Sequence, residues 1–316
     1  MKTGAFGIDI GGTTVKIGYF DTAGTLLDKW EIPTRKEQNG EWILPDIRDA
    51  VCAYMKEHDI PVETVAGIGL DVPGAVLEGG IVNRCANLGW GVTPVKKIME
   101  TMLPGLPVRV ANDANAAALG EMKHSDAYQN IVMVTLGTGV GGGVILNGEI
   151  WTGAFGAAGE LGHIPVNPEE TECCACGKKG CLEQYASATG IVRIAGKRLE
   201  SSGEDSVLRK VPKLTAKSVM EAAKQGDTLA VSVVETACDI LGRALASVAC
   251  VVDPDAFVIG GGVSKAGPML TDCIQKYYVK YAFHASRNTV FKLAELGNDA
   301  GICGAVQMIL SEKELL

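Results

Sequence analysis

Three features that would assign this 316-residue chain to a common class of protein are missing from its sequence. Lysine and arginine form no basic stripe and the net charge is −8, which argues against nucleic acid as the main partner. The longest apolar run near the C-terminus, "ALASVACVV", is too short to span a membrane. The start, "MKTGAFGIDIGG", lacks the apolar segment of a secretion signal. We therefore expect a soluble cytoplasmic protein without a membrane or nucleic-acid partner.

Glycine and cysteine, in contrast, are abundant. The 40 glycines predict many tight turns and close approaches of the backbone to a ligand. Ten cysteines without a secretion signal indicate a reducing compartment, where clustered cysteines bind metal more often than they form disulfides. A hydrophobic content of 47% is ample for a buried core, and the length suits two modest domains.

The order of the apolar segments predicts two similar α/β halves. Residues 4–20 and 130–147 each have the pattern of a strand, a glycine-rich turn and a second strand. Alternating strand and helix patterns follow both, including one long helix at 228–252 and a final helix at 301–310. We expect the boundary between the halves near residues 114–118.

The first glycine-rich turn, "DIGGTT", has the composition of a phosphate loop. Glycines allow backbone N–H groups to approach an anion, threonine hydroxyls add donors, and the aspartate could hold hydrated Mg²⁺. A tight hairpin without a ligand is the alternative. Lys16, two residues beyond the turn, is expected to be a solvated lysine on an edge hairpin. The candidate residues are Asp9, Gly11, Gly12, Thr13 and Thr14.

The second turn, "TLGTGVGGG", places Gly137, Gly139 and Gly142 at the spacing of a dinucleotide-binding motif. That motif requires a helix directly after the turn, whereas "GGVILNGEIW" predicts a strand, which disfavours a nicotinamide-dependent enzyme. Neither turn contains the P-loop motif either.

A third glycine cluster follows the strand-like segment "DAFVI". The three turns together resemble those of the actin-like ATPase superfamily of sugar kinases. In that superfamily two hairpin loops hold the phosphates and a third turn lies against the adenosine. Beyond the first turn, the resemblance implies that ATP is bound by Gly137, Thr138, Gly139, Gly260, Gly261 and Gly262.

A candidate metal site lies in the middle of the chain. His163, Cys174, Cys176 and Cys181 have the spacing H-x10-C-x-C-x4-C. Three thiolates and one imidazole suit tetrahedral Zn²⁺, and four protein ligands leave no open position for catalysis. Small buried cysteines are the alternative, which the close spacing of three of them makes less favourable. On spacing alone, Cys173 could replace Cys174.

The residues around this candidate site resemble the signature of the ROK family of sugar kinases (repressor, open reading frame, kinase), and bacterial glucokinases are most similar. The matching segments are "GELGH" and "CACGKKGCLE", and the similarity extends from "DIGGTT" to "GICGA". The resemblance selects Cys174 over Cys173 and implies that the zinc is structural. It also implies that Glu160, His163 and Glu183 contact the sugar.

The segment "VRVANDANAAALGE" places Asn112 and Asp113 where a strand ends and a helix begins. The residues alone favour helix capping, although α/β proteins also bind ligands at strand ends. The ROK resemblance implies that Asn112 binds the sugar and that Asp113 accepts the proton of the attacking hydroxyl. It also places Gly74 and Asn87 at the sugar; Asn87 could instead be a turn residue.

We therefore expect an α/β protein with two ribonuclease-H-like (actin-like ATPase) domains flanking a cleft. The small domain would comprise residues 1–115 and 301–316, and the large domain residues 116–300. The expected function is transfer of the γ-phosphoryl group of Mg·ATP to the 6-hydroxyl of glucose. The alternatives are an N-acetylmannosamine or N-acetylglucosamine kinase and a non-catalytic sugar sensor. Family members commonly form homodimers or tetramers, which we also expect here.

Overall fold

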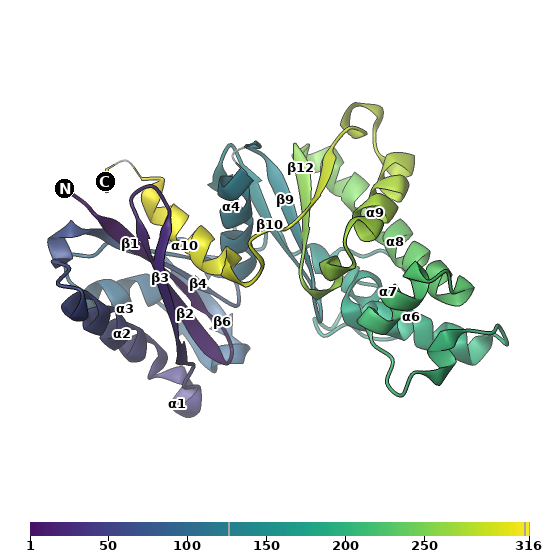
Figure 1. Ribbon diagram of the computed structural model, residues 1–316, viewed down its shortest axis with the longest axis horizontal. Coiled ribbons are helices and arrows are strands. Elements are labelled where there is room, and N and C mark those ends of the chain that lie inside the picture. The colour runs from purple at the N-terminus through teal and green to yellow at the C-terminus, as the bar shows by residue number, and fades with distance from the viewer. Residues whose placement is uncertain (126, 313, 316) are drawn as a thin grey trace. The chain divides into compact units, whose positions relative to one another are not determined.

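The chain forms two compact α/β units in the computed structural model, which describes residues 1–125, 127–312 and 314–315 (Figure 1). Unit 1 comprises Met1–Ala127, Gly143–Ala158 and Asn298–Leu316. Unit 2 comprises Tyr128–Gly142 and Gly159–Gly297.

Unit 1 is built on a five-stranded sheet with the order β3-β2-β1-β4-β8. The first three strands are antiparallel, and β4 and β8 continue the sheet in parallel with β1. Every residue of β4 is buried because helices cover both faces of the sheet. The five strands are β1 (Gly4–Ile10), β2 (Thr14–Asp21), β3 (Leu26–Pro33), β4 (Val65–Val72) and β8 (Val108–Asn112).

The helices of this unit divide its core into two layers. Apolar side chains of α2 and α3 pack on Phe6 and Ile8, while Ile302 and Val306 of α10 pack on Ala5 and the opposite face. The helices are α1 (Glu37–Gly40), α2 (Ile43–Glu57), α3 (Val95–Met102), α4 (Asp113–Ser125) and α10 (Ala300–Leu310). A small separate sheet contains β5 (Val76–Leu77), β6 (Ile81–Cys85) and β7 (Trp90–Thr93).

The C-terminal helix α10 lies beside α4 and the unit 1 sheet, as expected from the sequence (Figure 1). Glycines allow this close approach. A Cβ atom on Gly69 would lie 1.7 Å from the carbonyl oxygen of Ala305, and one on Gly304 would lie 1.7 Å from that of Ala116. Any larger residue at either position would force the helix away from its neighbours.

A second sheet has the order β11-β10-β9-β12-β13 and lies mostly in unit 2; β11 and the end of β10 belong to unit 1. The strands of this sheet are β9 (Ile131–Leu136), β10 (Val140–Leu146), β11 (Glu149–Ile150), β12 (Ala256–Gly260) and β13 (Val290–Leu293). The helices of unit 2 are α5 (Glu183–Ala186), α6 (Ala188–Ser201), α7 (Ala216–Lys224), α8 (Thr228–Val252) and α9 (Pro268–Tyr281). Within the described residues, no helix is long and apolar enough to cross a membrane.

Several expected elements are confirmed. The long helix α8 has the predicted bounds, and a strand rather than a helix follows the second glycine turn. The division of the chain differs from the expected one, because the expected boundary at residue 115 falls inside the continuous helix α4. Residues 143–158 also join unit 1, where Gly143 packs against Ala114. The cleft expected between the halves stays a prediction.

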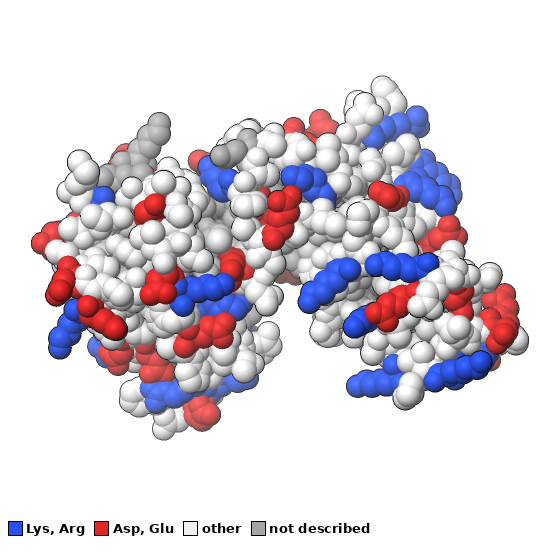
Figure 2. All heavy atoms as spheres, in the orientation of Figure 1, with Lys and Arg blue, Asp and Glu red and all other residues white. Residues whose placement is uncertain are grey.

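Acidic and basic side chains are mixed over the surface. On the face that Figure 2 shows, lysines and arginines lie among aspartates and glutamates in both units. This face therefore presents no continuous stripe of one sign.

Candidate active site and metal site

The first glycine turn connects β1 to β2 in unit 1. The amide of Gly11 donates to the carbonyl of Thr14 at 3.0 Å, which closes the turn. Thr34 holds the turn from behind, with its hydroxyl on the carbonyl of Gly11 (2.7 Å) and its amide on that of Thr13 (2.9 Å). A Cβ atom on Gly12 would meet no atom within 4 Å. The turn thus presents open backbone, as a phosphate loop must.

Asp9, at the end of β1, forms an ion pair with Lys16. The amine of Lys16 lies 3.1 Å from Asp9 Oδ2 and donates to the carbonyl of Asn298 at 3.0 Å. Asp9 and Lys16 are paired in the register of the β1–β2 hairpin. The expectation of a solvated lysine was therefore wrong, because the register places its amine on a carboxylate.

Asp71 is a buried carboxyl that the sequence analysis missed. It is 0% exposed, and neither carboxyl oxygen has a hydrogen-bond partner among the described residues. Its partner in the parallel register of β1 and β4 is Asp9. Burial, followed by the charges of Asp9 and Asp113, raises the pKa of Asp71 well above its ordinary value. The available signal was an acid within the otherwise apolar segment "VAGIGLDV".

Asn112 and Asp113 lie where β8 ends and α4 begins. Asn112 caps the helix, because its side-chain oxygen accepts hydrogen bonds from the amides of Ala114 (3.0 Å) and Asn115 (3.3 Å). Its amide group donates to the carbonyl of Gly74 at 3.0 Å, so the structure brings these two predicted residues together.

Asp113 is exposed in the first turn of α4, and its Oδ1 accepts from the amide of Ala114 at 2.8 Å. The positive end of the helix dipole favours its charged form. Asn87 is exposed in the short 3₁₀ turn Ala86–Leu88, within unit 1 like Asp113.

The second glycine turn lies between β9 and β10 and is held by the start of α6. The amide of Ala188 donates to the carbonyl of Gly137 at 2.8 Å, and the hydroxyl of Thr189 donates to that of Thr138 at 2.7 Å. A cavity of about 360 Å³ borders the turn at Thr138 and Gly139.

The third glycine cluster follows β12. Gly261 has a φ of 83°, and a Cβ atom there would lie 2.6 Å from the carbonyl oxygen of Leu136, so only glycine fits. A Cβ atom on Gly262 would meet nothing within 4 Å. Gly262 borders a cavity of about 490 Å³, which is also lined by Met220 and Val263.

The four predicted metal ligands converge in unit 2. One ligand atom from each of His163, Cys174, Cys176 and Cys181 lies within 4.8 Å of all the others. Cys176 Sγ is 3.6 Å from Cys181 Sγ, and Cys174 Sγ is 3.9 Å from His163 Nδ1. A tetrahedral zinc site with bonds near 2.3 Å needs ligand separations of about 3.8 Å. The four side chains therefore fit zinc, while Cys173 is exposed and outside the group.

Both carboxylates expected at the sugar lie beside these ligands. Glu160 Oε2 is 3.9 Å from His163 Nε2, the ring nitrogen that faces away from the cluster. The thiol of Cys174 donates to Glu183 Oε1 at 2.9 Å, while Glu183 Oε2 lies 2.5 Å from the position of a Cβ atom on Gly139. Burial raises the pKa of the Cys174 thiol to about 12. Zinc binding would displace this proton.

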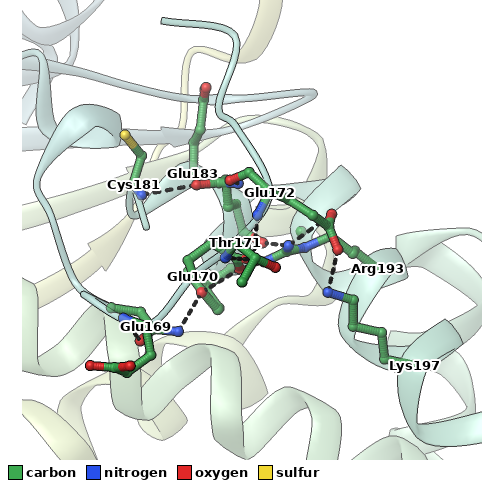
Figure 3. A network of polar contacts seen from close by, with 12 residues as sticks. Glu169, Glu170, Thr171, Glu172, Cys181, Glu183, Arg193 and Lys197 are labelled. Atoms are coloured by element: carbon green, nitrogen blue, oxygen red, sulfur yellow. Dashed lines mark hydrogen bonds and ion pairs between the residues drawn. The ribbon is translucent and has the colours of Figure 1, made fainter. Parts of the chain in front are cut away.

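A polar network fixes the segment that precedes the cysteines to α6 (Figure 3). Arg193 bridges Glu170 (2.7 Å) and Glu172 (3.1 Å), and Lys197 adds a second ion pair to Glu172. The hydroxyl of Tyr185 donates to Glu170 at 2.6 Å. Arg193, and then Tyr185, hold the pKa of the Glu170 carboxyl far below its usual range. The segment is therefore anchored by side chains as well as by the candidate metal site.

Comparison with known proteins shows to which family the chain belongs. The ROK family model matches residues 5–312. The chain is 43% identical over 314 residues to the glucokinase of Halalkalibacterium halodurans, covering 97% of this chain and 95% of that protein. It is 36% identical over 319 residues to the glucokinase of Streptomyces coelicolor, covering 96% of each.

Among solved structures, the chain is similar to a ROK family glucokinase from Streptomyces griseus crystallised with glucose and AMPPNP. The TM-score is 0.73 and the identity 34%, with 96% of this chain and 98% of that one covered. The chain belongs to the ROK family, and its fold is of the actin-like ATPase type, as the sequence led us to expect.

Replacing Asp71 with asparagine should change how stability depends on pH. The pKa of Asp71 is raised above the ordinary value of 3.8 in the folded protein, so the folded state holds this proton more tightly than the unfolded chain. This contribution to stability is fully present below the unfolded-state pKa of 3.8, and it is lost as the pH rises through the folded-state pKa. Asparagine is neutral throughout, so the D71N protein should lose less stability as the pH rises.

The measurement is urea unfolding of the nucleotide-free protein between about pH 4 and pH 8. Asp272→Asn, at an exposed position on α9, is the control and should follow the wild type. Parallel stability profiles for the wild type and D71N would show that Asp71 does not hold its proton more tightly in the folded state.

Proposed function

We propose that this chain is an ATP-dependent glucokinase, which transfers the γ-phosphoryl group of Mg·ATP to the 6-hydroxyl of glucose. The observation that carries the proposal is the position of Asp113. It is an exposed carboxylate at the start of α4, next to an asparagine whose side chain is fixed by two helix amides and a loop carbonyl. The identity of the chain to glucokinases over nearly its full length supports glucose as the acceptor.

The nucleotide would be bound mainly by backbone amide groups, with only a few charged side chains taking part. In this proposal the amides of the two glycine turns donate to the phosphates, and the cavity beside Gly262 accepts the adenosine. Asp9 would hold the hydrated Mg²⁺ that accompanies ATP, and Lys16, paired with the same carboxylate, would bring positive charge to the phosphates.

The sugar would be bound by polar side chains, of which Asn112 and Glu183 are held by hydrogen bonds. Asn112, whose side chain donates to the carbonyl of Gly74, and Asn87 would contact its hydroxyls from unit 1. From unit 2, Glu160, Glu183 and the Nε2 atom of His163 would accept or donate hydrogen bonds.

Asp113 is the proposed general base. It would accept the proton of the 6-hydroxyl as the oxygen attacks the γ-phosphorus atom, and the bond from that phosphorus to the leaving ADP oxygen would break. Negative charge at this position is favoured by the N-terminus of α4. Positioning and charge neutralisation supply most of the remaining acceleration in phosphoryl transfer.

The metal in this proposal is structural zinc. It would be held by His163, Cys174, Cys176 and Cys181, with no position left for substrate. When bound, zinc supplies cross-links that fix the loop, and the neighbouring Glu160 and Glu183 are thereby fixed as well.

The zinc site can be tested by a matched pair of serine variants. Cys174→Ser should reduce the zinc content from about one ion per chain to a small fraction, and should lower the melting temperature by several degrees. Cys173→Ser removes the neighbouring thiol, which is exposed and outside the cluster, and should change neither quantity. Metal analysis by mass spectrometry, combined with thermal unfolding, distinguishes them. Equal zinc loss in the two variants would contradict the proposed ligand set.

The Asp113→Asn variant tests the general base. It keeps the size of the side chain but cannot accept the proton, so kcat for glucose should fall by about 10² to 10⁴-fold while glucose still binds. ADP release with Mg·ATP should be measured against glucose, mannose, fructose, N-acetylglucosamine and N-acetylmannosamine. Undiminished turnover in the variant would exclude Asp113 as the base, and preference for an N-acetylated sugar would replace glucose as the substrate.

A further inference from the structure

The two glycine turns share a feature that the family signature does not contain. In each turn, the hydroxyl of a threonine outside the turn holds one of its carbonyl groups at 2.7 Å: Thr34 holds Gly11, and Thr189 holds Thr138. In each turn, the backbone amide of the same threonine or of the residue before it donates to a second carbonyl of the turn. The amide of Thr34 donates to Thr13 at 2.9 Å, and that of Ala188 donates to Gly137 at 2.8 Å.

These hydrogen bonds determine where the amides of the turns point. In a planar trans peptide, the carbonyl of one residue and the N–H of the next point in opposite directions. Because the carbonyls of Gly137 and Thr138 point to the start of α6, the amides of Thr138 and Gly139 point to the other side. By the same geometry, the amide of Gly12 points away from Thr34.

The amides turned outward in this way are available to an anion. None of the amides of Gly12, Thr138 and Gly139 has a hydrogen-bond partner among the described residues. Two consecutive N–H groups on the same side of a turn form an anion-binding concavity. The turn at Thr138 and Gly139 also borders the cavity of about 360 Å³, which Glu183 lines as well.

Thr189 is itself held in place. Ser187 is buried and caps α6, with its Oγ accepting from the amide of Gly190 at 2.9 Å and lying 2.9 Å from Thr189 Oγ1. The positive end of the helix faces the two carbonyls of the turn, which favours their partial negative charge. Thr34 is nearly buried, with 8% of its surface exposed, whereas Thr189 is an exposed residue. Each threonine is thus a fixed point for its turn.

We propose that Thr34 and Thr189 are positioning residues for the phosphoryl donor: each turns the peptides of one glycine loop so that the amides face a nucleotide phosphate. The inference rests on the proposed function in taking the two turns as phosphate loops. It adds that the side chains determining nucleotide affinity include two that act by holding the carbonyl groups of the turns. It also links the candidate metal site to the start of α6, because Glu183 accepts from Cys174 through its carboxylate and from Ser187, which caps the helix, through its carbonyl.

Matched pairs of variants at each threonine test the proposal. Valine keeps the shape and removes the hydroxyl, whereas serine keeps the hydroxyl and removes the methyl group. Dissociation constants for Mg·AMPPNP and, separately, for glucose are measured by calorimetry, which needs no turnover. T34V and T189V should each weaken Mg·AMPPNP binding by roughly three- to tenfold, with T34S, T189S and all glucose affinities within about twofold of wild type.

Thr271→Val is the control in unit 2. Its hydroxyl bonds to the carbonyl of Pro268 within α9, away from both turns, so the same exchange of atoms should leave both affinities unchanged. Unchanged Mg·AMPPNP affinity in both valine variants would overturn the proposal. So would equal losses in the valine and serine variants, or a parallel loss of glucose affinity, since either would indicate a general structural defect. Wild-type protein that binds no Mg·AMPPNP would overturn the proposed function itself.

Discussion

The candidate site in unit 2 depends on the hydrogen bonds that residues of the segment 181–189 make with their surroundings. Glu183 accepts from Cys174, the side chain of Gln184 accepts from the amide of Cys181, and Thr189 donates to the second glycine turn. One short segment therefore holds a candidate metal ligand, a candidate sugar ligand and a candidate phosphate loop. A metal bound at the candidate site would fix the end of that segment, and in this way a structural metal could support the proposed catalysis.

Unit 1 organises its part of the site by a different constraint. The parallel strands β1, β4 and β8 end at the same edge of the sheet, which gathers Asp9, Asp71 and Asn112 there. Gathering carboxyl groups is unfavourable unless cations or protons compensate them. Lys16 compensates Asp9, and burial together with the nearby carboxylates raises the pKa of Asp71, which favours its neutral form.

The local pattern of the sequence was sufficient for the elements and for the metal site. The bounds of α8 follow from an unbroken apolar periodicity after Asp227, which caps the helix with its side chain on the amide of Ala230. The convergence of the four candidate metal ligands was predictable because all of them lie within one short segment. The family signature supplied the roles of Asn112 and Asp113, for which spacing alone favoured capping; Asn112 does cap α4.

What the sequence did not reveal depends on the register and order of the strands or on partners that are distant along the chain. The pairing of Asp9 with Lys16 required the hairpin register, and the contact of Asp71 with Asp9 required the order of the strands. Thr189 lies far from the turn that it holds, so no local pattern connects them. Residues 143–158 joined unit 1 through the packing of Gly143 on α4, a contact that periodicity does not encode.

The central claim is that this site transfers phosphate from ATP to the 6-hydroxyl of glucose. Phosphorus and carbon NMR of the product formed from glucose and Mg·ATP tests it most directly, because the couplings identify the carbon that carries the new ester. The account predicts glucose 6-phosphate and ADP in equal amounts. An ester at another carbon, or ADP and free phosphate without a sugar ester, would contradict it.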